Sequence, residues 1–132
     1  MTITGIDHVQ VAAPPGCEEA ARAFYDGLLG LEELPKPAAL AARGGCWFRA
    51  GAEELHVGVE EPFAPARKAH PGLVVSGLDA LAERLAGAGI EVAWDETIPG
   101  TRRFHAADPF GNRLEFREGR NPVPAQPNRG PA

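Results

Sequence analysis

The sequence lacks several features that would assign it to a specialised class of proteins. It has only two cysteines, Cys17 and Cys46, and no CxxC pair, so we expect neither a disulfide framework nor a structural zinc site. No apolar run approaches the roughly 18 to 20 residues that a membrane-spanning helix needs. The opening residues MTITGIDHVQV also lack the basic stretch and apolar run of an export signal. We therefore expect a soluble, cytoplasmic protein with no membrane partner.

The charged residues, like the cysteines, do not indicate a specialised class of protein. The formal net charge is −5, and no block of lysines or arginines provides the electrostatic footprint of a nucleic-acid-binding surface. Nucleic acid is therefore excluded as an expected partner. At 132 residues, with 44% hydrophobic and 23% charged residues, the chain has the size and composition of one globular domain.

The pattern of secondary structure repeats once along the chain. A strand, a helix and three strands are predicted, and the same order then starts again after a connection rich in proline. The first set covers residues 3–12, 18–29, 31–34, 46–49 and 54–59, and the second covers 70–75, 78–88, 90–94, 102–107 and 113–118. The sequence therefore predicts an α+β fold made of two βαβββ modules.

The repeat also defines the expected domain boundaries. We expect a single domain over residues 1–120, with module 1 at about 1–62 and module 2 at about 66–118. Four prolines crowd residues 121–132, and we expect either a flexible tail or a segment that packs across a partner subunit.

Aligning the two modules places side chains that bind metals at equivalent positions. His8 and His70 both lie on the first strand of a module, while His56 and Glu115 both lie on the last. An imidazole or carboxylate that faced a dry core without a partner would cost several kcal/mol. A divalent cation would stabilise all four side chains, and such ligands suit Zn, Fe, Ni, Co or Mn almost equally. His105 has no equivalent histidine, and we expect it in the pocket lining or on the surface.

With these residues in view, the sequence resembles the vicinal-oxygen-chelate superfamily of glyoxalases, extradiol dioxygenases and bleomycin-resistance proteins. The resemblance covers residues 3–118. Its segments are GIDHVQV, ARAFYDGLLGLEE, AHPGLVVSGLDALAERLAGAGIEV and DPFGNRLEF. It implies a partly open mixed β-barrel, the glyoxalase-like fold, with a metal inside. His8, His70 and Glu115 match the usual ligand triad, and His56 falls where glyoxalase-like members use a glutamate.

The resemblance leaves two functions open. One is a metal-dependent lyase, isomerase or oxygenase that acts on a small molecule with vicinal oxygens, with Glu115 as the catalytic base. A dioxygenase is less supported, because the sole tyrosine, Tyr25, belongs to a helix. The other is a metal-free protein that binds an antibiotic-like ligand, as in the bleomycin-resistance branch.

Two further expectations concern the surroundings of the site. Aromatic and charged side chains could line a substrate pocket, and the candidates are Trp47, Phe104, His105 and Arg103. A half-open barrel leaves strand edges exposed, and covering them favours a homodimer.

Overall fold

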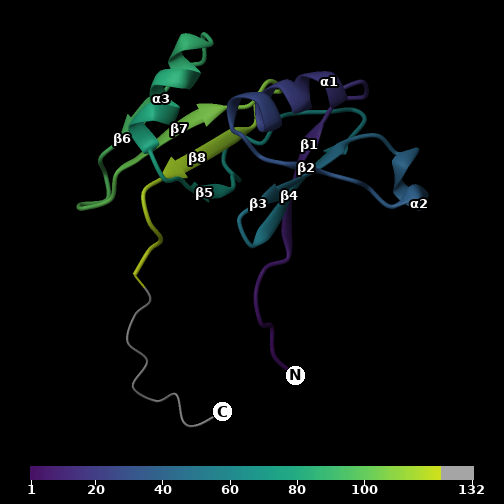
Figure 1. The fold of residues 1–132 in the computed structure, drawn as a ribbon, viewed down its shortest axis with the longest axis horizontal. Coiled ribbons are helices and arrows are strands. Elements are labelled where there is room, and N and C mark those ends of the chain that lie inside the picture. Colours follow the sequence, from purple (N-terminus) through teal and green to yellow (C-terminus); the bar gives the residue numbers. More distant parts are fainter. Residues whose placement is uncertain (123–132) are drawn as a thin grey trace.

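The computed structural model describes residues 1–122 and contains two sheets (Figure 1). The first half of the chain forms β1 (His8–Ala13), α1 (Glu18–Ala21), the π-helical segment η1 (Arg22–Leu28), β2 (Glu33–Leu34), α2 (Ala38–Ala41), β3 (Cys46–Ala50) and β4 (Glu53–Val59). The second half forms β5 (Gly72–Val74), α3 (Leu78–Gly87), β6 (Ala93–Asp95), β7 (Arg103–Ala107) and β8 (Arg113–Arg117). The expected tail at 121–132 lies outside the described residues from 123 onward.

The two sheets have the same topology. The first sheet has the strand order β1-β4-β3-β2, and the second has the order β5-β8-β7-β6. In each sheet the first and last strands of the module pair in parallel, and the other pairs are antiparallel. The sheets do not close on each other, so the predicted partly open glyoxalase-like fold with two βαβββ modules is confirmed.

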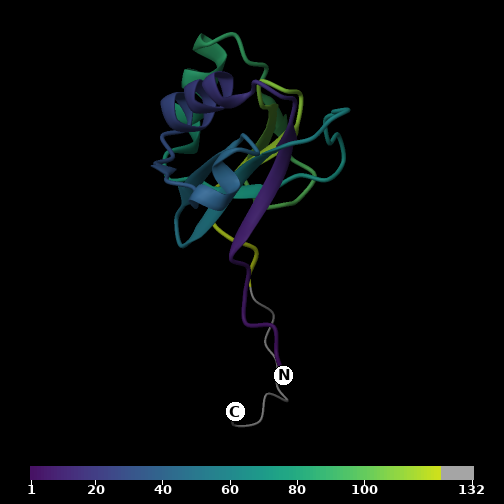
Figure 2. The same cartoon turned by 90° about the vertical axis from the view of Figure 1, so that its right-hand side faces the viewer.

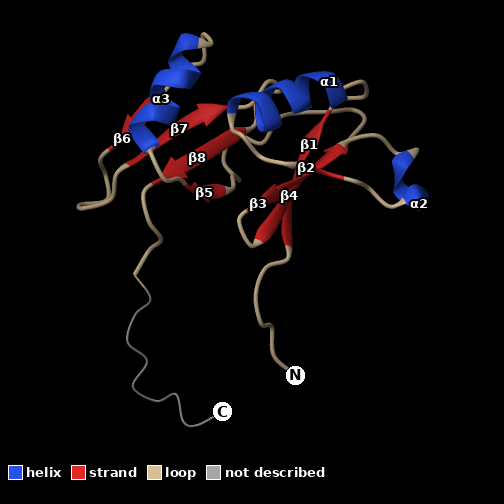
Figure 3. Cartoon of the chain, viewed as in Figure 1, coloured by secondary structure: helices blue, strands red, loops and turns tan. Residues whose placement is uncertain are grey.

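The helices α1 and α3, with the segment η1, lie on one side of the two sheets, and α2 lies apart from them (Figures 2 and 3). Because successive strand residues point to opposite faces, each sheet has an apolar face toward its helix and a second face of different composition. The apolar faces contribute the buried residues Val11, Phe48, Leu55, Val57, Phe104, Leu114 and Phe116, which join Leu78 and Leu85 of α3 in one core. We call the second face of each sheet its polar face.

Element boundaries differ from the expected ones at several places. The first strand begins at His8, and residues 3–7 before it are exposed. Of these, the Asp7 carbonyl accepts from the Glu54 amide of β4 at 3.1 Å. The expected helix at 18–29 changes from α to π geometry at Arg22, and the wider turns keep both Phe24 and Tyr25 buried. The short helix α2 was not predicted. None of the helices within the described residues is long and apolar enough to cross a membrane.

A buried polar network connects the two halves of the chain. The Tyr25 hydroxyl on η1 donates to Asp108 Oδ2 at 2.7 Å, in the turn before β8. Asn112, which is 1% exposed, donates through Nδ2 to the Ala12 carbonyl of β1 at 2.7 Å and accepts from the Ala66 amide. Buried polar groups need such partners. The DPFGN turn therefore holds the end of the first strand against the second half.

Candidate metal centre

The polar face of the second sheet carries the ionisable side chains of β7 and β8. His105 lies directly opposite Glu115 across the antiparallel pair, and Arg103 lies opposite Arg117. The residues between them point to the other face, where Phe104 stacks on Phe116 in the core. The period of two along each strand thus separates a polar cluster from an apolar core.

Three side chains on this face could hold a metal ion, and we call them the His70 cluster: His70, His105 and Glu115. Their donor atoms lie within 4.8 Å of one another, and no other group of three such residues occurs within residues 1–122. His70 Nε2 is 3.0 Å from Glu115 Oε1, and His105 Nε2 is 3.7 Å from the same oxygen. Two ligand atoms about 2.1 Å from one ion lie roughly 3.0 to 3.4 Å apart, so the His70–Glu115 pair has the spacing of two ligands of one ion. His105 at 3.7 Å would have to move a few tenths of an ångström closer.

The backbone fixes which nitrogen of His70 faces the cluster. Nδ1 lies 2.8 Å from the carbonyl oxygen of Lys68, which has no proton to give, so Nδ1 must donate. In neutral His70 the Nε2 lone pair then points at a carboxylate oxygen of Glu115. Two acceptors at 3.0 Å repel unless a proton or a cation lies between them. A donor set of two imidazoles and one carboxylate therefore fits a divalent metal.

Charges near the cluster favour the protonation states that metal ligands need. Burial alone would raise the pKa of Glu115, but the hydrogen bond with His70 and the charge on Arg103 outweigh it, so this pKa is below its usual value. Burial, with the charge on Arg113, lowers the pKa of His105. At neutral pH Glu115 is therefore ionised and His105 is neutral, which leaves both with lone pairs for a cation.

Two arginines hold the Glu115 carboxylate from opposite sides. Arg103 donates to Glu115 Oε1 at 3.1 Å and also to Asp95 Oδ2 at 3.1 Å. Arg117, whose side chain is 11% exposed, approaches Glu115 Oε2 at 3.5 Å. Charged hydrogen bonds of this kind restrict the carboxylate to one orientation.

The polar face of the first sheet carries three stacked rings, which we call the histidine stack: Trp47, His56 and His8. The Trp47 and His56 rings are 4.1 Å apart and almost parallel, at 2°. His8 covers the other side of His56 at 4.3 Å. His56 is buried, with Nε2 2.9 Å from Glu54 Oε1, whereas the His8 side chain is 46% exposed and its Nδ1 contacts Asp7.

The strand registers show that the stack and the cluster occupy equivalent positions. His56 pairs with Gln10, two residues after His8, and Glu115 pairs with Gly72, two residues after His70. In the same way, Trp47 lies opposite His56 as His105 lies opposite Glu115. The alignment of the modules that the sequence suggested is therefore confirmed as an alignment of positions.

The structure brings together only part of the predicted ligand set. His70 and Glu115 meet as expected, while His8 and His56 lie in the other sheet and contact each other. Among the predicted pocket residues, His105 and Arg103 adjoin Glu115, and Trp47 belongs to the stack. Phe104, fully buried between Trp94 and Phe116, belongs to the core because its neighbours on β7 occupy the polar face.

Sequence reasoning missed Arg117 and did not pair Glu115 directly with His105 or Arg103. Arg117 lies two residues after Glu115 on the same strand, so the period of two already puts both on one face. The five-residue turn at 108–112 also sets the hairpin register that places His105 opposite Glu115. Both signals were present in the sequence. The contact between Asp95 and Arg103 had no comparable signal.

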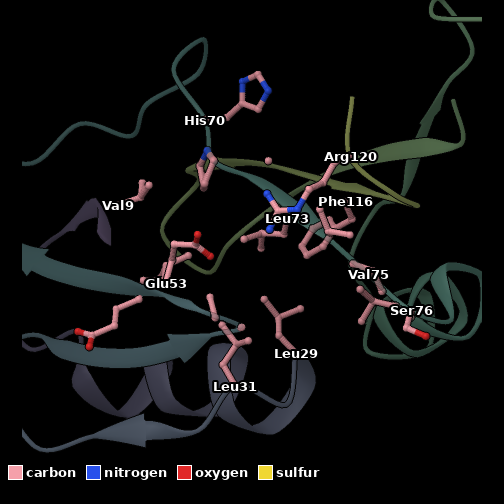
Figure 4. A pocket seen from close by; sticks show the side chains of 18 of the residues that line it. Val9, Leu29, Leu31, Glu53, His70, Leu73, Val75, Ser76, Phe116 and Arg120 are labelled. Carbon is pink, nitrogen blue, oxygen red and sulfur yellow. The ribbon is translucent and has the colours of Figure 1, made fainter. Parts of the chain in front are cut away.

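A cavity of about 880 Å³ opens between the two halves, beside His70 (Figure 4). Figure 4 shows His70 at one end and Leu29 and Leu31 at the other. Its lining is largely apolar and includes Val9, Leu29, Leu31, Leu73, Val75 and Phe116. Its size is in the range of small-molecule sites.

Known proteins share this architecture. A crystal structure of a glyoxalase family protein from Bacillus anthracis is 54% identical, with a TM-score of 0.87, over 91% of this chain and 98% of that one. A lactoylglutathione lyase from Agrobacterium tumefaciens is 22% identical, with a TM-score of 0.70, over 90% and 96%. A fosfomycin resistance protein from Listeria monocytogenes is 15% identical, with a TM-score of 0.73, over 90% and 96%.

The last two similarities show the fold alone. Among curated proteins, none matches this sequence. The sequence profile of one family matches residues 5–116, which include both sheets almost entirely and all residues of the histidine stack and the His70 cluster. The chain belongs to the Glyoxalase/Bleomycin resistance protein/Dioxygenase superfamily, as the resemblance to vicinal-oxygen-chelate proteins indicated.

Proposed function

We propose that this protein is a divalent-metal-dependent lyase, isomerase or oxygenase that acts on a small molecule with two vicinal oxygens. The observation that carries the proposal is the 3.0 Å contact between His70 Nε2 and Glu115 Oε1, with His105 beside it. The family usually binds a divalent metal, and the His70 cluster offers it three ligands. When bound, the cation supplies Lewis-acid chemistry that polarises the oxygens of the substrate.

The residues of the site have separate roles in this proposal. His70, whose ring is oriented by the Lys68 carbonyl, would hold the metal through Nε2. Glu115 is ionised at neutral pH, and its carboxylate accepts a proton from a carbon of the substrate. His105 is neutral at this pH and lies 3.7 Å from Glu115, so it either ligates the metal or passes that proton on. The largely apolar cavity beside His70 offers space for the apolar part of the substrate.

We infer that His8 and His56 complete the ligand set of the metal when a first sheet, which contains β1, lies against a second sheet, which contains β5. They occupy the positions equivalent to His70 and Glu115 in the first module. β1 and β5 are both edge strands, and a homodimer that covers these edges would bring one module of each kind together. The expected set is then His8, His56, His70 and Glu115.

Metal analysis of purified variants tests this proposal. The wild-type protein, titrated with Zn²⁺, Ni²⁺ or Co²⁺ and then dialysed, is expected to retain about one ion per chain. Affinity should fall at least about tenfold in His70→Ala and Glu115→Ala, since each loses one of a few ligands. Asp79→Ala, which removes an exposed carboxylate bound to Arg102, serves as the control.

The remaining histidines distinguish the two ligand sets. A fall in metal affinity in His8→Ala and His56→Ala, together with dimers in light scattering, supports a site completed by both modules. A fall in metal affinity in His105→Ala, without a fall in His8→Ala or His56→Ala, supports the His70 cluster as the whole site. Absence of bound metal under all conditions would contradict the enzyme proposal.

The second candidate function is metal-free binding of an antibiotic-like small molecule. The largely apolar cavity of about 880 Å³ favours it, because burial of apolar surface there needs no metal. Metal-free protein that binds an apolar aromatic ligand, and loses it in Leu31→Gln but not in Glu115→Gln, would support this function.

A further inference from the structure

The charges on the polar face of the second sheet carry an inference about the ligand. Residues 113, 115 and 117 of β8 point to this face, together with residues 103 and 105 of β7. The face therefore has three guanidinium groups, and Glu115 and Asp95 are the two carboxylates in contact with Arg103. Arg113 lies on the same face of β8, two residues before Glu115.

A divalent cation would make this face strongly positive. The carboxylates do not fully compensate the arginines, and the cation would add two further positive charges in a partly buried site. Charges buried in a low-dielectric environment interact strongly, so the excess would oppose metal binding unless the ligand brings negative charge. Neutral vicinal oxygens alone would leave this repulsion in place.

Arg103 is the arginine available to meet that negative charge. Its Nη1 and Nη2 atoms contact Glu115, Asp95 and Thr97, but its buried Nε–H has no hydrogen-bond partner. Such an unsatisfied donor costs free energy until a ligand or water accepts from it. Arg103 also lines a hollow of about 350 Å³ with Trp94 and Thr101. The unpaired Nε atom itself is buried beside it.

Arg117 is already satisfied by the protein. Its Nε donates to the Gly119 carbonyl at 3.0 Å and its Nη2 donates to Asn121 Oδ1 at 2.8 Å, while Nη1 faces Glu115. Every nitrogen of Arg117 thus has a partner within the chain. It contributes charge to the site without a free donor.

We propose that the substrate is a small oxygenated acid, and that Arg103 binds its carboxylate, phosphonate or phosphate group. The inference rests on the proposed function, because it assumes that two other oxygens of the same molecule face the metal. Guanidinium pairs well with each of these anions, and a charge-assisted hydrogen bond to the free Nε–H strengthens the pair. Arg103 is then the residue that determines specificity for an acid.

Matched chelators test the assignment by calorimetry on the Zn²⁺-loaded protein. 3,4-Dihydroxybenzoate and its methyl ester share two vicinal oxygens and differ in one negative charge. We expect the wild-type protein to bind the acid about tenfold or more tightly than the ester. Arg103→Ala should abolish this preference, and the comparison is made with zinc in excess because Arg103 also holds the ligand Glu115. 3,4-Dihydroxyphenylphosphonate distinguishes a carboxylate site from a phosphonate or phosphate site.

Arg49→Ala is the control, since it removes an arginine from the polar face of the first sheet and should keep the preference. Equal affinity of the wild-type protein for acid and ester, measured with and without zinc, would overturn the assignment. A preference for the acid that survives in Arg103→Ala would also overturn it, because Arg103 would then not be the group that binds the anion. Failure of the proposed function has a separate signature, which is absence of zinc from the wild-type protein.

Discussion

The two sheets of this protein share one topology and use it for two different surfaces. The polar face of the first sheet holds a stack of aromatic rings, in which His56 is buried between Trp47 and His8. The equivalent face of the second sheet holds an ionic cluster, in which Glu115 contacts His70 and Arg103. Equivalent backbone positions therefore do not imply equivalent chemistry.

The difference follows from two substitutions at matched positions. Where the first sheet has Trp47 opposite His56, the second has His105 opposite Glu115. Flat rings on neighbouring strands gain by stacking, and they need few charged partners. A buried carboxylate needs donors on every side, and the arginines of β7 and β8 supply them. The polar face of the second sheet is thus the more strongly charged of the two.

The largest expected effect comes from replacing the central residue of each face with leucine in the metal-free protein. Glu115→Leu should lower the free energy of unfolding by about 3 kcal/mol, because it leaves two buried guanidiniums without their shared carboxylate. His56→Leu should cost only about 1 to 2 kcal/mol, since it loses stacking while Glu54 remains accessible to water. Urea denaturation measures both.

Glu115→Gln serves as a control for side-chain size. Its free energy of unfolding should lie between those of the wild-type protein and Glu115→Leu. Equal losses in the two leucine variants would show that the ionic cluster and the stack contribute equally to stability. The contrast between the faces would then concern ligand binding only.

The next effect concerns the connection between the two halves. Asn112→Ala removes the hydrogen-bond donors to Ala12 and Asp108 and the acceptor for the Ala66 amide. We therefore expect the free energy of unfolding to fall by about 2 to 3 kcal/mol. Each sheet has one tryptophan, Trp47 in the first and Trp94 in the second. In a pair of variants that each keep only one of these tryptophans, the signal of that tryptophan follows the unfolding of its own sheet. The unfolding transitions of the two variants should coincide when Asn112 is present and should separate when Asn112→Ala is added.

Tyr25→Phe offers a milder version of the same test. It removes one buried hydrogen bond to Asp108, whose carboxylate still accepts from Asn112, and should cost about 1 kcal/mol. Coincident transitions in both variants would contradict the connecting role of this network.

The smallest effect is a pH dependence of stability that arises from Glu18 in the first half of the chain. The Gly45 amide and the Cys17 thiol donate to Glu18, and these bonds hold the pKa of its carboxyl below the usual 4.5. A lowered pKa stabilises the fold above about pH 4.5, and this contribution is lost as the pH falls further. Glu18→Gln should therefore be about 1 kcal/mol less stable at pH 7 and show a flatter decline below pH 4.5. Urea midpoints from pH 7 to pH 3 measure the difference.

Much of the fold was predictable because it is local. Alternating apolar residues, glycine stops and the DPFGN turn are visible in the sequence, and they define most elements to within a few residues. The repeat also predicted the matched positions of His8 and His70. The short helix α2 escaped prediction because its apolar residues show no helical period and Pro37 precedes it.

The candidate site was predictable only in part. Nothing in the sequence says how far apart two sheets will lie, so the prediction placed all four ligand-type residues in a common cavity. The chain brings His70 and Glu115 together and adds His105 and Arg103 through the register of one hairpin.

By itself, the sequence determined two βαβββ modules, the face on which each side chain lies and the family, because periodicity and turns act over short distances. Only the tertiary structure decided which ionisable groups meet. Contacts such as those of His70 with Glu115 and of Tyr25 with Asp108 join residues far apart in the chain. Their energies depend on burial and on partners from other elements, which no local pattern specifies.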